Sequence, residues 1–294
     1  MQDNPVIVLA QIDALVGDIP GNARTIIEWT RRAGSEMPCD LVVFPELVLT
    51  GYPPEDLLLR PSLQRRVEGA LRCIVEALPE NDLILGLPWM ENGHLYNCAV
   101  LVSKGKVSQI YRKRCLPNYQ VFDEKRYFSE GDKPCVFPWR DMRLGLTVCE
   151  DIWEDFPARE TAAAGAELLI NINASPFHVN KQIQRVNRVR EHAIAHRLPV
   201  AYVNLVGAQD ELVFDGGSFV VDAHGRLRMM APQFEEGLYR LSVAELREAA
   251  EASPEPRVDE ETSDRQLYQA LVVSVRDYVN KNGFKSVVLG LSGG

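Results

Sequence analysis

The sequence predicts an α/β fold in which helices cover mixed sheets. Short, continuous apolar runs such as residues 40–46 predict buried strands, and longer segments with helical apolar spacing, such as residues 62–78, lie between them. Tight turns, as at Lys104-Gly105, join other strands directly. Helical connections favour parallel pairing and hairpins give antiparallel pairing, so the two together predict mixed sheets.

Strand and helix signals alternate through the first half of the chain. An apolar run predicts a strand at residues 5–12, and Asn22 is expected to cap a helix that ends near Ala33. Residues 40–46 are the next strand, and Thr50-Gly-Tyr-Pro-Pro54 breaks the pattern before the helix at 62–78. Further strands are expected at 82–87, 94–103 and 106–113.

The same alternation continues to residue 230. Apolar runs predict strands at 136–139, 143–149, 166–172, 200–206, 217–222 and 226–230, with a short helix at 158–165. A longer amphipathic helix is expected at 181–197, with one face formed by Ile183, Val186, Val189, Ala193 and Ile194.

The composition changes after about Val243. Residues 249–261 are acidic, contain proline and have few large apolar side chains, which is typical of a linker. We therefore predict a first domain at 1–246, a linker at 247–263, and the beginning of a second domain at 264–294. A helix at 264–282 should present Leu267, Leu271, Val275 and Tyr278 on one face, with Gly283 after its end, before a buried strand from Ser286. One helix and one strand cannot form a core, so the chain is expected to end just inside that domain.

Charge and cysteine content exclude several classes of protein. The net charge of −9 disfavours nucleic acid and anionic membranes as partners. We expect neither a signal peptide nor a membrane span, because no apolar stretch is long enough. Six cysteines without CxxC pairing predict free thiols and a cytoplasmic protein. The five histidines show no metal-ligand spacing, so no metal is expected in the first domain.

Three reactive side chains follow apolar strands directly. Cys149 ends one strand and is followed by an acidic turn, while Glu46 and Lys113 end two others. A rigid element that ends at an open sheet edge is a suitable place for a nucleophile, a base and a cation. Each residue also has an ordinary interpretation: an inert core thiol, a surface carboxylate and a solvated lysine. An active Cys149 would need a cation nearby, because the adjacent carboxylates raise a thiol pKa.

The motifs around these residues resemble a known superfamily. Phe44-Pro-Glu46-Leu, Tyr111-Arg-Lys113-Arg and Val148-Cys149-Glu-Asp-Ile-Trp153 resemble the three signature blocks of the nitrilase (carbon–nitrogen hydrolase) superfamily, in the same order. Thr50-Gly-Tyr-Pro-Pro54 and Leu116-Pro-Asn-Tyr119 make the chain most similar to the glutaminase domains of glutamine-dependent NAD⁺ synthetases. Leu289-Gly-Leu-Ser292-Gly-Gly294 resembles the start of the pyrophosphate loop of their synthetase domain.

The resemblance implies a four-layer αββα sandwich, followed by the start of a Rossmann-like ATP-pyrophosphatase domain. It implies that Cys149 is the nucleophile, Glu46 the general base and Lys113 the cation that stabilises the oxyanion. Glu124 matches a second carboxylate of the family, which positions the lysine and the substrate; on sequence alone Glu124 is better explained as an exposed charge. The residues that match glutamine-binding positions are Tyr119, Ser175 and Lys181. Those that match positions of the ATP loop are Ser292, Gly293 and Gly294.

The resemblance also implies the ligands. Glutamine is the expected substrate, and no cofactor is expected for the glutaminase domain, whereas deamido-NAD⁺, ATP and Mg²⁺ are expected for the synthetase domain, in a homo-oligomer. Two alternatives stay open: a free-standing amidase of the superfamily acting on a small carboxamide, and a non-catalytic interaction domain. The linker and the helix that follows it disfavour the first, and the presence of all three catalytic residue types disfavours the second.

Overall fold

The computed structural model describes residues 4–247, 254–259 and 261–293. Its strands are β1 (Val6–Gln11), β2 (Leu41–Val43), β3 (Asp82–Glu91), β4 (His94–Ser103), β5 (Lys106–Arg112), β6 (Cys135–Trp139), β7 (Met142–Val148), β8 (Leu168–Asn173), β9 (Val200–Asn204), β10 (Val206–Gln209), β11 (Leu212–Asp215), β12 (Phe219–Val221), β13 (Leu227–Met230) and β14 (Gly237–Ser242). Its helices are α1 (Ile19–Glu36), α2 (Pro61–Ala77), α3 (Asp155–Ala163), α4 (Lys181–His196), α5 (Val243–Arg247) and α6 (Asp264–Lys281), with short 3₁₀ turns η1 (Glu55–Leu59), η2 (Glu124–Arg126) and η3 (Cys149–Ile152).

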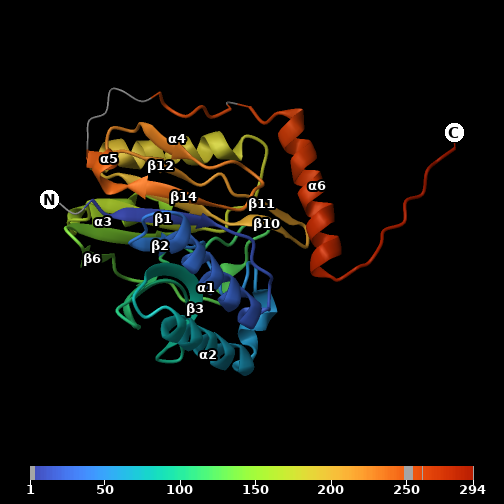
Figure 1. The fold of residues 1–294 in the computed structure, drawn as a ribbon, viewed down its shortest axis with the longest axis horizontal. Coiled ribbons are helices and arrows are strands. Elements are labelled where there is room, and N and C mark those ends of the chain that lie inside the picture. Colours follow the sequence, from blue (N-terminus) through green and yellow to red (C-terminus); the bar gives the residue numbers. More distant parts are fainter. Residues whose placement is uncertain (1–3, 248–253, 260, 294) are drawn as a thin grey trace.

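Two mixed six-stranded sheets lie between two layers of helices (Figure 1). The first sheet has the order β14-β1-β2-β3-β4-β5 and the second β13-β12-β9-β8-β7-β6. In each sheet three neighbouring strands are parallel, β1-β2-β3 and β7-β8-β9, and every other strand is antiparallel to the strand beside it. The predicted four-layer αββα sandwich is confirmed.

Successive side chains of a strand belong to different apolar cores. In β1, Ile7 and Leu9 belong to the core between the two sheets, whereas Val8 belongs to the core beneath α1 and α2. On the opposite side of the molecule, Val186 and Val189 of α4 pack against the second sheet. Because successive side chains of a strand point to opposite faces, a fully buried strand such as β1 reads as a continuous apolar run.

The first helix begins earlier than the sequence predicted. Asp18, rather than Asn22, is the N-cap, since its side chain accepts a hydrogen bond from the Gly21 N–H at 3.0 Å. Pro20 lies in the first turn, where its missing N–H costs nothing. Asn22 is buried inside the helix, where its amide bonds to both backbone groups of Leu15. The expected cap therefore fixes the loop before the helix.

Three strands were not predicted. β10 and β11 form a separate antiparallel hairpin, and β14 pairs antiparallel with β1 in the register Val6↔Ser242. β14 has no continuous apolar run, because Arg240 lies between Leu238 and Leu241, and its pairing with a strand more than 200 positions away identifies it. The expected strand at 200–206 is interrupted at Leu205, which lies between the end of β9 in the second sheet and the start of β10 in the hairpin.

The buried face of α6 also differs from the prediction. The expected apolar face of Leu267, Leu271, Val275 and Tyr278 is exposed, and the residues that pack against the hairpin are Ala270 and Val273. Polar contacts set this orientation: the Asp277 carboxylate accepts the Ala208 N–H at 2.9 Å, and Lys281 donates to Asp13 at 2.6 Å. Helical spacing locates an apolar stripe but does not say which face meets a neighbour.

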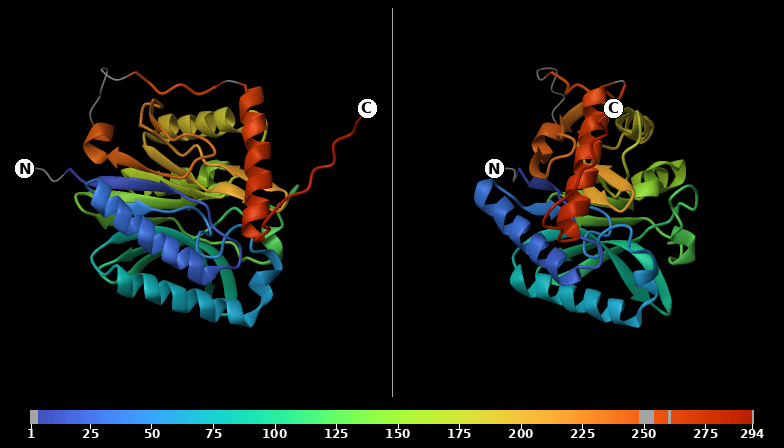
Figure 2. Two further views of the ribbon diagram at one scale, coloured as in Figure 1. Left: turned by 45° about the vertical axis from the view of Figure 1, so that its right-hand side comes forward. Right: turned by 90° about the vertical axis from the view of Figure 1, so that its right-hand side faces the viewer.

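The segment after α6 is not the buried strand that was expected. From Ser286 to Gly293 it has no regular structure and is exposed, with Val288 fully accessible, and it runs away from the body (Figure 2). A strand requires a hydrogen-bonded neighbour, and no described strand pairs with it. Part of the predicted linker, residues 248–253 and 260, lies outside the described residues, and the predicted domain boundaries stay predictions.

Two further expectations concern the whole chain. All six cysteines lie among the described residues and are free, as predicted. Within the described part of the chain, no helix combines the length and apolar character needed to cross a membrane.

Gly86 of β3 packs closely against the backbone of the segment after β2. A Cβ at Gly86 would lie 2.2 Å from the backbone nitrogen of Leu47, which cannot move without displacing Glu46. We expect Gly86→Ala to lower the free energy of unfolding by about 2 kcal/mol or more, the magnitude of overpacking. The matched control is Gly69→Ala in α2, where an added Cβ has no atom within 4 Å; it should be neutral or slightly stabilising. Urea denaturation measures both, and equal stability of the two variants would contradict the prediction.

Candidate active site

Glu46 lies directly after β2 with its side chain fully buried. Its Oε1 accepts hydrogen bonds from Lys113 Nζ and Asn97 Nδ2, both at 2.7 Å, and its Oε2 accepts one from the Ala174 N–H at 2.9 Å. Three donors on three different segments hold the carboxylate in one orientation. The residue that the sequence proposed as a base is therefore both desolvated and fixed.

Lys113 follows β5 and is also fully buried. Its Nζ donates to Glu46 Oε1 at 2.7 Å and to Glu124 Oε1 at 2.9 Å. Burial alone would lower the pKa of Lys113, but the carboxylates of Glu124 and Glu46 more than offset it, and the pKa is raised well above its usual value. A permanent cation therefore lies between two carboxylates.

Glu124, in η2, is buried rather than an exposed charge. Its Oε1 also accepts the hydroxyl of Tyr52 at 3.0 Å, and its Oε2 has no hydrogen-bond partner among the described residues. Burial raises the pKa of Glu124 to about 7; Lys113 opposes the shift and Glu46 adds to it. This carboxyl can therefore change its protonation near neutral pH.

Cys149 opens η3 immediately after β7, one residue beyond the end of the strand that was expected to include it. Its φ of 44° lies in the left-handed region, which a side chain rarely adopts except where the surrounding structure enforces it. Burial, followed by the charge of Glu46, raises the thiol pKa well above its usual value, and Lys113 offsets only part of this. The resting group is a neutral thiol, so a base must remove its proton during attack.

Asp151 anchors the turn that carries the thiol. Its buried carboxylate accepts the N–H of Val148 at 2.9 Å and the hydroxyl of Tyr111 at 2.8 Å. It also accepts the N–H groups of Arg114 and Cys115, at 3.1 and 2.8 Å. These bonds connect the nucleophile turn to the segment that directly follows Lys113, so the spacing of thiol and cation is fixed.

Two of the predicted glutamine-binding residues lie around the same turn. Tyr119 is exposed and its hydroxyl donates to the Glu150 carboxylate at 3.0 Å, while the Nζ of Lys181 lies 3.9 Å from the centre of the Trp153 ring. Burial, and then Arg185, lowers the pKa of Lys181, and the carboxylate of Glu150 opposes this. The Glu150 carboxylate and the Lys181 ammonium group therefore both lie near Cys149.

Ser175 is joined to the cluster through the backbone. It is buried, its N–H donates to Asn204 at 2.9 Å, and its hydroxyl accepts from Arg185 Nε at 3.2 Å. The preceding residue, Ala174, is the one that donates to Glu46. Of the predicted ATP-loop residues, Ser292 and Gly293 are exposed in the irregular segment after α6, and Gly294 lies outside the described residues.

Comparison with known proteins assigns the family. The family model for carbon–nitrogen hydrolases matches residues 7–253. The chain belongs to the carbon–nitrogen hydrolase family. The glutamine-dependent NAD⁺ synthetase of Acinetobacter baylyi is 39% identical over 292 residues, which cover 98% of this chain and 53% of that protein. The chain thus spans about half the length of the curated relatives it matches.

Solved structures agree with this assignment. The glutamine-dependent NAD⁺ synthetase of Acinetobacter baumannii in complex with ADP is similar with a TM-score of 0.91 and 36% identity, over 99% of this chain and 55% of that one. A variant of the amidase from Nesterenkonia sp. AN1 is similar with a TM-score of 0.74 and 28% identity, over 85% of this chain and 95% of that one. Its active site cysteine carries the acetamide moiety of fluoroacetamide.

Arg185 is a residue of this carbon–nitrogen hydrolase that sequence reasoning missed. It is fully buried on α4, pairs with Asp215 at 2.8 Å, and donates to the carbonyl groups of Ser175 and Pro176 at 2.9 Å. The predicted face of α4 was wrong at Ile194, which is exposed. The available signal was the spacing of Arg185, which lies four positions before Val189 and therefore on the same face of the helix. An arginine on a core face must have partners.

The premise that the histidines lack metal-ligand spacing is wrong, whereas the expected absence of a metal stays a prediction. His192 and His196 are one helical turn apart on α4, which is a spacing that metal ligands use, and Asp155 at the start of α3 meets them. The carbon–nitrogen hydrolase cluster of Glu46, Lys113 and Cys149 includes none of these three residues.

The pKa of Glu124 predicts a measurable pH dependence. A carboxyl whose pKa rises from 4.5 to about 7 on folding binds more protons in the folded state, so its stabilisation is present below pH 4.5 and is lost as the pH rises through 7. Relative to Glu124→Gln, the native protein should lose on the order of 2–3 kcal/mol of unfolding free energy between pH 5 and pH 8. Urea denaturation of both proteins at the two pH values measures this.

The matched control is Glu130→Gln, which removes an exposed carboxylate that pairs only with Lys125. This variant should follow the native protein at both pH values. If Glu124→Gln also follows it, Glu124 is already ionised at pH 5 and the deduction from its burial is wrong.

Proposed function

We propose that this chain is the glutaminase portion of a glutamine-dependent NAD⁺ synthetase, which hydrolyses the side-chain amide of glutamine through a cysteinyl thioester. The observation that carries the proposal is the buried cluster of Glu46, Lys113 and Glu124 beside the buried thiol of Cys149. The names of the relatives support the choice of glutamine as the amide.

In the first step Glu46 removes the thiol proton as the sulfur of Cys149 attacks the amide carbon. The C=O π electrons move onto oxygen, where Lys113 Nζ and the N–H that follows Cys149 meet the developing charge. That N–H lies in the first turn of η3, where helical N–H groups have no partner within the helix. Preorganised donors of this kind stabilise the tetrahedral intermediate strongly, because they need no rearrangement.

Collapse of the intermediate breaks the C–N bond and leaves a thioester. Glu46 returns its proton to the departing nitrogen, so ammonia leaves as a neutral molecule. Glu46 then takes a proton from water, which attacks the thioester carbon, and the proton passes to the sulfur as glutamate is released. Glu124 has a positioning role, since it holds Lys113 from the side opposite to Glu46.

Charges around the nucleophile support an amino-acid substrate over a simple carboxamide. Glutamine carries an α-ammonium and an α-carboxylate, and Glu150 and Lys181 provide one group of each opposite sign near Cys149. Tyr119 and Ser175 complete the proposed binding set. A small neutral amide would use neither charge.

For the longer protein we propose that the ammonia amidates deamido-NAD⁺ at the expense of ATP with Mg²⁺. The names of the relatives and the ADP in the A. baumannii structure support this. Ser292, Gly293 and Gly294 would begin the loop that holds the ATP phosphates, in a cytoplasmic homo-oligomer.

Substitution of the base or the cation tests the chemistry. Glu46→Gln and Lys113→Met should each lower the rate of ammonia release from glutamine on the order of 10²-fold or more, the loss typical of a positioned acid–base or oxyanion group. Cys149→Ala gives the background rate. The matched control is Lys125→Met, an exposed lysine next to Glu124 that pairs with Glu130, which should keep the native rate. Near-native turnover by Glu46→Gln or Lys113→Met, with circular dichroism unchanged, would make that residue structural.

Substitution of Lys181 tests the substrate. Lys181→Met should lower kcat/KM for glutamine about 10- to 100-fold, the value of one charged contact, and change that for acetamide less than about threefold. Lys133→Met, an exposed lysine of another loop, is the control. Equal losses for both amides would remove Lys181 from substrate recognition, and faster turnover of acetamide than of glutamine would favour a free-standing amidase.

A further inference from the structure

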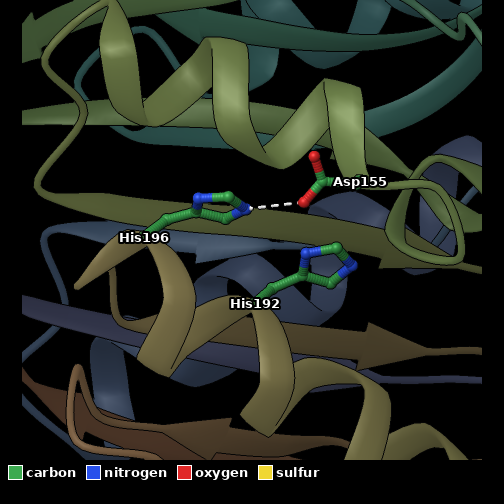
Figure 3. A group of neighbouring side chains, drawn as sticks. All are labelled: Asp155, His192 and His196. Atoms are coloured by element: carbon green, nitrogen blue, oxygen red, sulfur yellow. Dashed lines mark hydrogen bonds and ion pairs between the residues drawn. The ribbon is translucent and has the colours of Figure 1, made fainter.

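Asp155, His192 and His196 form a cluster away from the proposed catalytic residues. One possible ligand atom from each lies within 4.8 Å of the other two. The two histidines lie one turn apart on α4, and Asp155 is the first residue of α3 (Figure 3). The cluster therefore connects the two helices that cover the second sheet.

We propose that these three residues bind a late first-row transition metal ion of the Zn²⁺ class. Two imidazole nitrogens and one carboxylate oxygen are a donor set that suits Zn²⁺, Co²⁺ and Ni²⁺ better than Mg²⁺ or Ca²⁺, which prefer oxygen ligands. Three protein ligands leave a fourth tetrahedral position for water.

A hydrogen bond fixes the orientation of the His192 ring. His192 is buried, and its Nε2 lies 2.8 Å from the carbonyl oxygen of Ile152, to which it donates as Nε2–H. This bond leaves Nδ1 as the unprotonated nitrogen, and Figure 3 shows that nitrogen on the side of the ring toward Asp155. Ligand histidines in metal sites are commonly oriented by such a bond from their other nitrogen.

The other two groups are close enough to share an ion. His196 Nε2 lies 3.1 Å from Asp155 Oδ1, and two ligands of one tetrahedral zinc, each about 2.0–2.1 Å from it, lie about 3.3 Å apart. Asp155 is exposed and His196 is half-buried, so an ion can reach them from solvent. Two cations lie nearby: Arg159 pairs with the other oxygen of Asp155, and Arg188 pairs with Glu191. Arg159 leaves Oδ1 available to the ion.

The position of the cluster gives such an ion a structural consequence. Ile152, which orients His192, is the last residue of η3, and η3 begins at Cys149. An ion at this site would hold the start of α3 against α4 directly behind the turn that carries the nucleophile.

The test is metal binding by the full chain in a Cys149→Ala background, which removes the thiol as a competing zinc ligand. Isothermal titration with Zn²⁺ should show one equivalent, and Co²⁺ should give the visible absorption of a tetrahedral complex. In this background His196→Ala and Asp155→Asn should each raise the dissociation constant at least about tenfold and abolish the cobalt spectrum. Mg²⁺ should not compete.

The matched control is His224→Ala, which removes an exposed histidine outside the cluster and should keep both signals. Circular dichroism and gel filtration establish that each variant is folded. The proposal is overturned if no equivalent of Zn²⁺ binds, or if folded His196→Ala binds it as tightly and with the same cobalt spectrum.

Discussion

The buried ammonium group of Lys113 is the constraint on which the rest of the site depends. A cation removed from water must be paired, and Lys113 contacts Glu46 and Glu124 directly. Removing Lys113 would leave the carboxylates of Glu46 and Glu124 in the core without their shared cation. Glu46, Lys113 and Glu124 are therefore one unit, in which the positions of all three are set together.

This unit also fixes how the two sheets meet. Glu46 and Lys113 follow strands of the first sheet, whereas Cys149 and Ala174 follow strands of the second. The hydrogen bond from Ala174 to Glu46 and those that Asp151 accepts from the segment after Lys113 cross from one sheet to the other. A shift of the sheets relative to each other would break these bonds. Packing of the apolar core between the sheets and assembly of the site are thus the same structural event.

The chemistry-bearing residues could be predicted because local sequence carries their signal: Glu46, Lys113 and Cys149 each follow an apolar run. Arg185 and Asp151 could not be assigned roles in this way, since their partners lie about 30 to 40 positions away and are brought together only by the fold. The face of α6 was wrong for a related reason. Apolar periodicity predicts an apolar face of the helix, but the hydrogen bond between Asp277 and the hairpin decides which face is buried. The predicted strand after α6 needed a neighbour that the described residues do not provide.

The pairing of β14 with β1 has a consequence for biosynthesis. β1 is synthesised more than 200 residues before β14, so one of its two edges is covered only when residues 237–242 have been made. Until then the nascent chain presents a continuous apolar strand with a row of unpaired backbone groups, which is a template for intermolecular association. The order of synthesis therefore places the greatest aggregation risk at the N-terminal end of the chain, and completion of β14 ends it.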